Sequence, residues 1–322
     1  EHLLIDFSVM FNYPSEASEI DKSLRPLTIE NLGWVRYDPW RNLDNLRLLD
    51  ENVAISETLL YKNSGGRTIV DATTIGIGRD PEALARIARI TGINIIMGAG
   101  YYVGDTHPNT MDKKTISELT GEIVRDLTEG VGKSGIKAGI IGELGCSWPL
   151  MDNERKVLVA GANAQIQTGA TILIHPGRNE TSPLEIMDVL DKSGADSSRV
   201  IMGHIDRTIT NYNTLIELAH TGCYLEFDLF GWETSNYSLS EVDMPNDGQR
   251  IDFIKRLIGN NLISRLVLAQ DICTKNRTTK YGGHGYHHIL ENIVPRMLKR
   301  GITENEIDTM LVKNPANLLT MS

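Results

Sequence analysis

Four side chains that could bind a metal ion stand at the ends of short, mainly apolar runs: Glu143, His175, His204 and Asp271. Taken singly, a histidine there is usually an ordinary polar residue, and an aspartate after a strand is more often a helix N-cap. Four such residues at equivalent places are harder to explain in that way, because a buried charge costs several kcal/mol unless it is paired or metal-bound. Imidazole and carboxylate groups together suit zinc or a similar divalent ion, so the pattern predicts a metal site.

The runs that precede these residues have the composition of buried parallel strands. Val200-Ile201-Met202 and Leu266-Val267-Leu268 are apolar on both faces, which is typical of strands covered on both sides. The stretches between the runs carry helix-start signals, namely Asp80-Pro81 and capping-box patterns at 115–118, 182–185 and 303–306. Seven runs are expected to form strands: residues 67–74, 94–101, 138–144, 171–175, 200–204, 223–230 and 265–271.

Alternating strands and helices predict an α/β fold with a parallel sheet, and eight such units close into a (β/α)8 TIM barrel. The first strand would have to precede or include His2. Residues 7–61 then form an N-terminal insertion after strand 1, with a polar first half and a helical second half around 43–60, and the chain ends in C-terminal helices. A doubly wound open sheet would require a Gly-rich phosphate-binding turn, and Gly98-Ala99-Gly100 is too short for one. We therefore expect one barrel domain over residues 1–322, with the four strand-end side chains at a single opening.

Composition excludes several classes of protein. The chain has 322 residues, a formal net charge of −10 and no block of Lys or Arg, which argues against a nucleic-acid partner. No apolar run approaches the ~20 residues that span a bilayer, so we expect no membrane segment. Three widely spaced cysteines without a CxxC pair favour a reducing, cytoplasmic location over a disulfide framework. The chain starts at Glu1, without Met, inside what reads as an ordered segment, so we expect a truncated N-terminus.

Longer motifs around the predicted ligands make the sequence similar to a known family. They are Glu1-His2 and residues 139–147 (GIIGELGCS), 174–178 (IHPGR), 203–208 (GHIDRT) and 271–284. Over essentially its whole length, the chain resembles the phosphotriesterase-related proteins of animals, in the phosphotriesterase branch of the amidohydrolase superfamily. The resemblance implies a metal-dependent hydrolase that binds two divalent metal ions, usually zinc, at the barrel mouth.

The resemblance also implies a role for each ligand. His2 matches the second histidine of a strand-1 His-x-His motif, whose first histidine would precede Glu1. Glu143 matches the bridging ligand, which is a carboxylated lysine in many relatives, and His175 and His204 match the ligands of the second metal. Asp271 matches a ligand that is also the catalytic proton shuttle. Metal ions of this kind turn a bridging water into a hydroxide nucleophile, and Asp271 would carry its proton to the leaving group.

The resemblance implies amide hydrolysis of a small anionic N-acyl substrate, namely N-acetyltaurine, to taurine and acetate. Lactonase relatives have Asp-Arg-Tyr-Gly where this chain has residues 228–231, Asp-Leu-Phe-Gly, so their arginine is missing. Arg207 stands where phosphotriesterases have an aspartate. Both departures weaken the alternatives of a lactonase or a phosphotriesterase. A non-catalytic binding barrel is a further alternative, but it predicts a replaced ligand, and every visible ligand position is filled.

Four side chains are candidate substrate contacts. Arg178 and Arg207 each follow a ligand histidine by three residues and could hold an anionic group, unless they pair with carboxylates such as Asp206 or Glu226. Tyr102 matches a tyrosine near the substrate in relatives, unless it is a packed loop aromatic. His284 lies in a Gly-rich loop and could line the pocket, unless it is a surface or capping residue. A homodimer is left open as the assembly.

Overall fold

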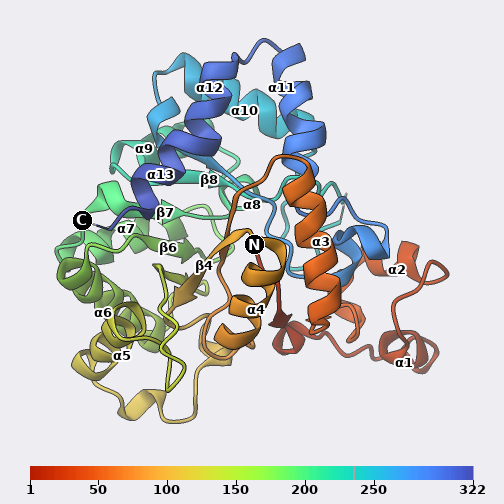
Figure 1. Cartoon of the computed structure of the whole chain (residues 1–322), viewed down its shortest axis with the longest axis horizontal. Helices are drawn as coiled ribbons and strands as arrows, with labels where there is room; N and C mark the ends of the chain where they lie inside the picture. The colour runs from red at the N-terminus through yellow and green to blue at the C-terminus, as the bar shows by residue number, and fades with distance from the viewer. Residues whose placement is uncertain (235, 322) are drawn as a thin grey trace.

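A parallel sheet of seven strands forms the centre of the molecule in a computed structural model that describes residues 1–234 and 236–321. Each strand pairs with its neighbour in sequence, in the order β3-β4-β5-β6-β7-β8-β9. All seven predicted strands and the alternating α/β fold are confirmed, and Figure 1 shows the helices arranged around the strands. The strands are β3 (Thr68–Asp71), β4 (Asn94–Ala99), β5 (Ile140–Gly145), β6 (Ile172–His175), β7 (Val200–Met202), β8 (Tyr224–Phe227) and β9 (Leu266–Leu268).

The first residues of the chain lie between the two edges of this sheet. The Glu1 amine donates to the Val70 carbonyl (3.1 Å), and the Ala72 N–H donates to the Glu1 carbonyl (2.9 Å). On the other side, the His2 N–H donates to the carbonyl of Ile272 (3.2 Å), just beyond β9. The segment therefore closes the barrel at the place where the eighth strand was predicted.

Two apolar layers stabilise the barrel. One layer fills its interior, and Leu318 in the last helix closes it at the end where the strands begin. The other lies between the strands and the helices, and it forms one continuous core. Burial on both faces is the reason why the strands are apolar throughout. The interior side chains on the strands are Ala72, Ile140, Leu173, Ile201, Tyr224 and Val267.

Helices follow the strands, and most begin where the sequence predicts. Asp80 caps its helix by accepting the Ala83 N–H (2.9 Å), and Thr115 and Thr303 form the expected capping boxes. The capping box predicted at Ser182 is wrong, because the helix already begins there and the Ser182 hydroxyl accepts the Gly177 N–H (3.0 Å). The helices are α4 (Pro81–Thr91), α5 (Ile116–Thr128), α6 (Asp152–Thr168), α7 (Ser182–Lys192), α8 (Ile205–Thr208), α9 (Tyr212–His220), α10 (Asp247–Gly259), α11 (Val294–Lys299), α12 (Glu304–Asp308) and α13 (Asn314–Leu319).

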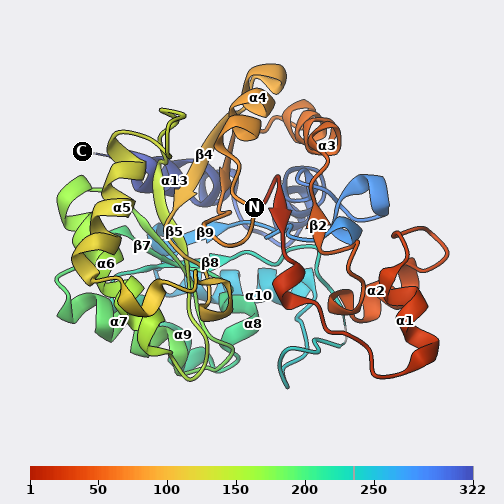
Figure 2. The same ribbon diagram turned by 90° about the horizontal axis from the view of Figure 1, so that it is seen from below.

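The insertion lies to one side of the barrel in both Figure 1 and Figure 2. Its polar first half contains two helices that the sequence did not indicate, α1 (Ala17–Leu24) and α2 (Leu32–Tyr37). The predicted helix of its second half is α3 (Glu51–Asn63), which begins late because the Asp50 carboxylate caps it. Before α3, strand β2 (Arg47–Leu48) pairs antiparallel with β1 (Ile5–Asp6) and ties the insertion to the barrel.

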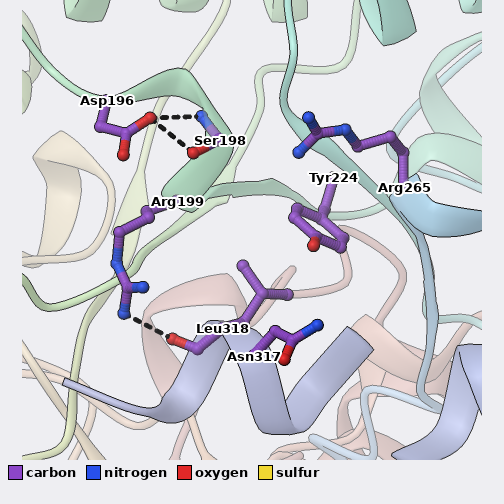
Figure 3. Close-up of a pocket in the computed structure, with 7 residues that line it drawn as sticks. All are labelled: Asp196, Ser198, Arg199, Tyr224, Arg265, Asn317 and Leu318. Atoms are coloured by element: carbon purple, nitrogen blue, oxygen red, sulfur yellow. Dashed lines mark hydrogen bonds between the residues drawn. The ribbon is translucent and has the colours of Figure 1, made fainter. Parts of the chain in front are cut away.

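A cavity of ≈ 350 Å³ lies at the end of the barrel where the strands begin (Figure 3). Tyr224 and Arg265 line it, and Arg199 crosses to the carbonyls of Leu318 (3.0 Å) and Thr320 (2.6 Å). Residues at this end of a barrel contribute to stability, whereas the predicted ligands lie at the opposite end, where the strands finish. Among the helices in the described part of the chain, none combines the length and the apolar character needed to traverse a bilayer.

Candidate metal centre

All five predicted metal ligands converge at the carboxyl ends of the strands. Glu143, His175 and His204 form one group of three, and His2, Glu143 and Asp271 form a second. Within each group, the potential ligand atoms all lie within 4.8 Å of one another. The side chains are buried except that of Asp271, which is 16% exposed. The two groups of potential ligands lie next to each other and share the Glu143 carboxylate.

The histidines of β6 and β7 point their ring nitrogens at one spot. His175 Nδ1 lies 2.8 Å from His204 Nε2 and 3.2 Å from Glu143 Oε1. Burial lowers the pKa of His175 well below its ordinary value, and the neighbouring positive charge of His204 lowers it further. A neutral imidazole offers a lone pair to a cation, as a metal ligand must.

The two acidic ligands show why this cluster fits divalent cations. Burial raises the pKa of Glu143, and the negative charge of Asp271 adds to that rise. Burial also acts to raise the pKa of Asp271, but its contact with His2, at 3.3 Å, and the charge of His204 hold it below its ordinary value. Two carboxylates this close repel each other, and cations between them would offset the repulsion. Three imidazoles and two carboxylates form a donor set typical of zinc and similar ions.

Two residues outside the predicted set orient the ligand histidines. The Asp228 carboxylate accepts the backbone N–H of His204 (2.9 Å) and lies 3.0 Å from its Nδ1. His2 Nδ1 is 2.9 Å from the Thr73 hydroxyl, which donates its own hydrogen to the Leu4 carbonyl (3.1 Å) and therefore accepts from His2. Each bond occupies the outer ring nitrogen and leaves Nε2 for the cluster, as hydrogen-bond partners of metal-binding histidines do.

Two of the ligand residues have an unusual backbone. His204 (φ 53°) and Asp271 (φ 48°) lie in the left-handed region, which residues other than glycine seldom adopt. Asp228 holds the His204 N–H, and Arg277 Nη1 donates to the Asp271 carbonyl (2.9 Å). Strained backbone of this kind concentrates at functional sites, which supports a built site here.

Arg207 extends into the cluster from α8. It is 3% exposed, and its Nη2 donates to the Pro176 carbonyl (3.1 Å) and lies 3.2 Å from His175 Nε2. Burial lowers the pKa of Arg207, and the positive charge of nearby Arg178 contributes to that decrease. The alternative pairing with Asp206 is not found, because Asp206 accepts from Arg250 (2.6 Å).

Arg178, after β6, is held by a tyrosine instead of a carboxylate. Its Nε donates to the Tyr237 hydroxyl (2.8 Å). Neither Arg178 nor Arg207 forms an ion pair with a carboxylate within residues 1–234 and 236–321. Two neighbouring cations without a partner anion favour an anionic ligand.

Tyr102 and His284 have different surroundings. The Tyr102 hydroxyl lies 3.0 Å from His175 Nδ1, and burial raises its pKa well above the ordinary value, so it is a neutral phenol beside the cluster. His284 is exposed and stacks on His288, with ring centroids 4.1 Å apart. His288 in turn contacts Asp247 at 2.9 Å. The structure therefore brings Tyr102 into the ligand cluster, but no hydrogen bond connects His284 to it among the described residues.

A buried ion-pair network behind the cluster was not foreseen. Arg250 is 0% exposed and pairs with Asp206 (2.6 Å) and Asp247 (2.9 Å). Asp206 also accepts the Leu229 N–H (3.2 Å), and Arg250 donates to the Trp232 carbonyl (2.9 Å). The network fixes the chain after β8. Asp247 and Arg250 stand three residues apart in α10, but Asp206 lies in α8, and no sequence pattern relates it to them.

This barrel, with two groups of potential metal ligands at its mouth, has the architecture of the metal-dependent hydrolases. The sequence matches the phosphotriesterase family over residues 1–319, and the chain belongs to that family. The predicted family and the predicted class of enzyme are thereby confirmed.

Individual relatives agree with this assignment. The N-acetyltaurine hydrolase of Bos taurus is 47% identical over 322 residues, which cover 99% of this chain and 92% of that protein. A phosphotriesterase-related protein of Nematostella vectensis is 47% identical over 324 residues, covering 99% and 93% of the two chains. The crystal structure of a resiniferatoxin-binding protein from Rhodobacter sphaeroides superposes with a TM-score of 0.96 at 32% identity, covering 99% of this chain and 89% of that one.

Proposed function

We propose that this protein hydrolyses the amide bond of N-acetyltaurine to give taurine and acetate. The observation that carries the proposal is two groups of potential metal ligands beside two arginines that have no carboxylate partner within residues 1–234 and 236–321. N-acetyltaurine combines an amide, which needs a polarised carbonyl, with a sulfonate, which needs a cation. The name of the Bos taurus relative supports the same substrate.

Two divalent ions, with zinc as the expected metal, would be held by the five ligands. Glu143 would be shared, His175 and His204 would complete one site, and His2 and Asp271 the other. When bound, the ions would supply Lewis acidity, which polarises the amide carbonyl and lowers the pKa of water.

Side chains of the protein would transfer the proton and bind the substrate. Asp271, the most exposed ligand, would take a proton from the attacking water and deliver it to the amide nitrogen as the C–N bond breaks, which releases taurine as an amine. The neutral Tyr102 hydroxyl would orient the acyl group, and Arg178 and Arg207 would hold the sulfonate through charge-assisted hydrogen bonds. His284, in the Gly-rich loop after Asp271, remains a proposed contact to the substrate.

The direct test is taurine release by the purified protein. We expect turnover of N-acetyltaurine and none of a γ-lactone or a phosphotriester. Arg207→Met should raise KM for N-acetyltaurine. Arg256→Met is a matched control, because Arg256 stacks on Tyr212 (3.7 Å) and has no contact with the cluster. Hydrolysis of the esters alone would refute the proposal.

The location and the assembly are separate proposals. The three cysteines, Cys146, Cys223 and Cys273, are free and buried, which agrees with the predicted reducing compartment. A cytoplasmic location and a homodimer stay predictions, which cell fractionation and light scattering would test.

A further inference from the structure

The segment after β8 carries a tyrosine to Arg178. Tyr237 is 4% exposed, and its hydroxyl accepts the hydrogen of Arg178 Nε (2.8 Å). The Arg178 guanidinium carbon lies 5.9 Å from the centre of the Tyr237 ring. Trp232 packs with this ring in an edge-to-face arrangement, with centroids 5.8 Å apart. Tyr237 is thus held by packing and meets Arg178 at a defined position.

Two hydrogen bonds fasten the same segment to the N-terminal insertion. Ser238 Oγ donates to Asp38 Oδ1 (2.9 Å), and Asn236 Nδ2 donates to the Tyr37 carbonyl (3.2 Å). These donors flank Tyr237 in sequence. We call residues 236–238 together with residues 37–38 the clasp. The clasp fixes the backbone of Tyr237, so that its hydroxyl reaches Arg178.

The hydrogen bond to Tyr237 uses only one edge of the planar guanidinium group. It occupies Nε, and neither Nη group of Arg178 forms a hydrogen bond within the described ranges 1–234 and 236–321. Two Nη groups in a fixed plane form the fork that recognises carboxylate, sulfonate and phosphate groups in a bidentate manner. A flexible arginine would first have to lose rotamer entropy, and the tyrosine bond removes part of that cost.

We propose that Tyr237 is a specificity-determining positioning residue, which the clasp holds in place so that Arg178 presents both Nη groups to the anionic end of the substrate. This inference rests on the proposed function, since it assumes an anionic amide. It adds the segment after β8 and the insertion to the elements that select the substrate. Neither Tyr237 nor the clasp supplies a metal ligand, so these residues would affect substrate selection without forming part of the ligand set.

The test compares two substrates that differ in charge. N-acetyltaurine carries the sulfonate, whereas N-(2-hydroxyethyl)acetamide is a neutral amide of similar length. Tyr237→Phe should raise KM for N-acetyltaurine about tenfold, the effect of losing a hydrogen bond to a charged group, and change kcat less than about twofold. The kinetic constants for the neutral amide should not change. Ser238→Ala, which weakens the clasp, should act in the same direction with a smaller effect.

Two further measurements separate positioning from a structural role. Tyr212→Phe is the matched control, because Tyr212 also stacks with an arginine and accepts a hydrogen bond, from Asn260 (2.9 Å), without a contact to the cluster. In an Arg178→Met background, Tyr237→Phe should cause no additional loss, since the tyrosine acts through the arginine. Thermal melting would verify that every variant is folded.

The outcomes distinguish the inference from the function on which it rests. Unchanged KM in Tyr237→Phe, an equal loss for both substrates, or an additive loss in the double variant would overturn the inference alone. Failure of the unmodified protein to release taurine would overturn the proposed function and the inference together.

Discussion

The two halves of the metal centre are built differently. Glu143 lies within β5, His175 ends β6 and His204 follows β7, and these strands are hydrogen-bonded neighbours in the sheet. His2 and Asp271 lie on segments at the closure of the barrel, where side chains add to a few backbone hydrogen bonds. There the Glu1 carboxylate accepts the N–H groups of Gln270 (2.8 Å) and Ile272 (2.9 Å), and the Tyr286 hydroxyl donates to the His2 carbonyl (2.7 Å).

Exposure singles out one ligand of the second half. The side chains of His175, His204 and His2 are 5%, 4% and 4% exposed, whereas that of Asp271 is 16% exposed. A residue that exchanges protons with water and a leaving group must be reachable, and Asp271 meets this requirement best among the predicted ligands. We therefore expect proton transfer on the side of His2 and Asp271, and metal retention mainly on the side of His175 and His204.

The largest expected effect is that of Asp271→Asn. Asparagine keeps an oxygen ligand but cannot accept the proton, so kcat for N-acetyltaurine should fall about 10³-fold while the metal content changes little. Steady-state kinetics together with elemental analysis would measure both. A kcat near that of the unmodified protein would assign the proton transfer to another group.

Asp228→Asn should have the next largest effect, and in the other half. Asp228 contacts His204 through both of its carboxylate oxygens. Asparagine lacks the negative charge and has only one such oxygen. Metal affinity of the Glu143–His175–His204 site should fall about 100-fold, which is the upper end of the effect of removing a hydrogen-bond partner of a metal ligand. Competition with a chelator would measure it, and unchanged affinity would mean that the backbone alone orients His204.

Thr73→Val should have a smaller effect, confined to the His2 side. Valine retains the shape but loses the single neutral hydrogen bond to His2 Nδ1. Affinity of the His2–Glu143–Asp271 site should fall about tenfold, with the other site unaffected. Equal weakening of both sites in the same chelator titration would show that the halves are not independent.

The parts of the molecule that could be predicted are those that repeat. The strands recur with apolar side chains on both faces, so their order and the ligands at their ends, from Glu143 to Asp271, followed from pattern. His2 lies on no such strand, and its assignment came from resemblance to the family. Asp228 stands at the end of a strand as the ligands do, and this position was a signal that it belongs to the site.

The parts that could not be predicted depend on contacts between distant, irregular segments. Tyr237 meets Arg178 across 59 positions of sequence, and Ser238 meets Asp38 across 200. No periodicity relates such pairs, because loops are positioned by tertiary contacts and not by local propensity. The helices α1 and α2 were missed for a related reason, since short polar helices in an insertion have little apolar periodicity to display.

The most direct measurement is the number of divalent ions that the protein binds, combined with their order of removal by a chelator. We predict two ions per chain, with the ion on the His2 and Asp271 side leaving first and hydrolysis of N-acetyltaurine lost at that step. A single ion per chain, or two ions that leave together, would contradict a centre made of two unequal halves.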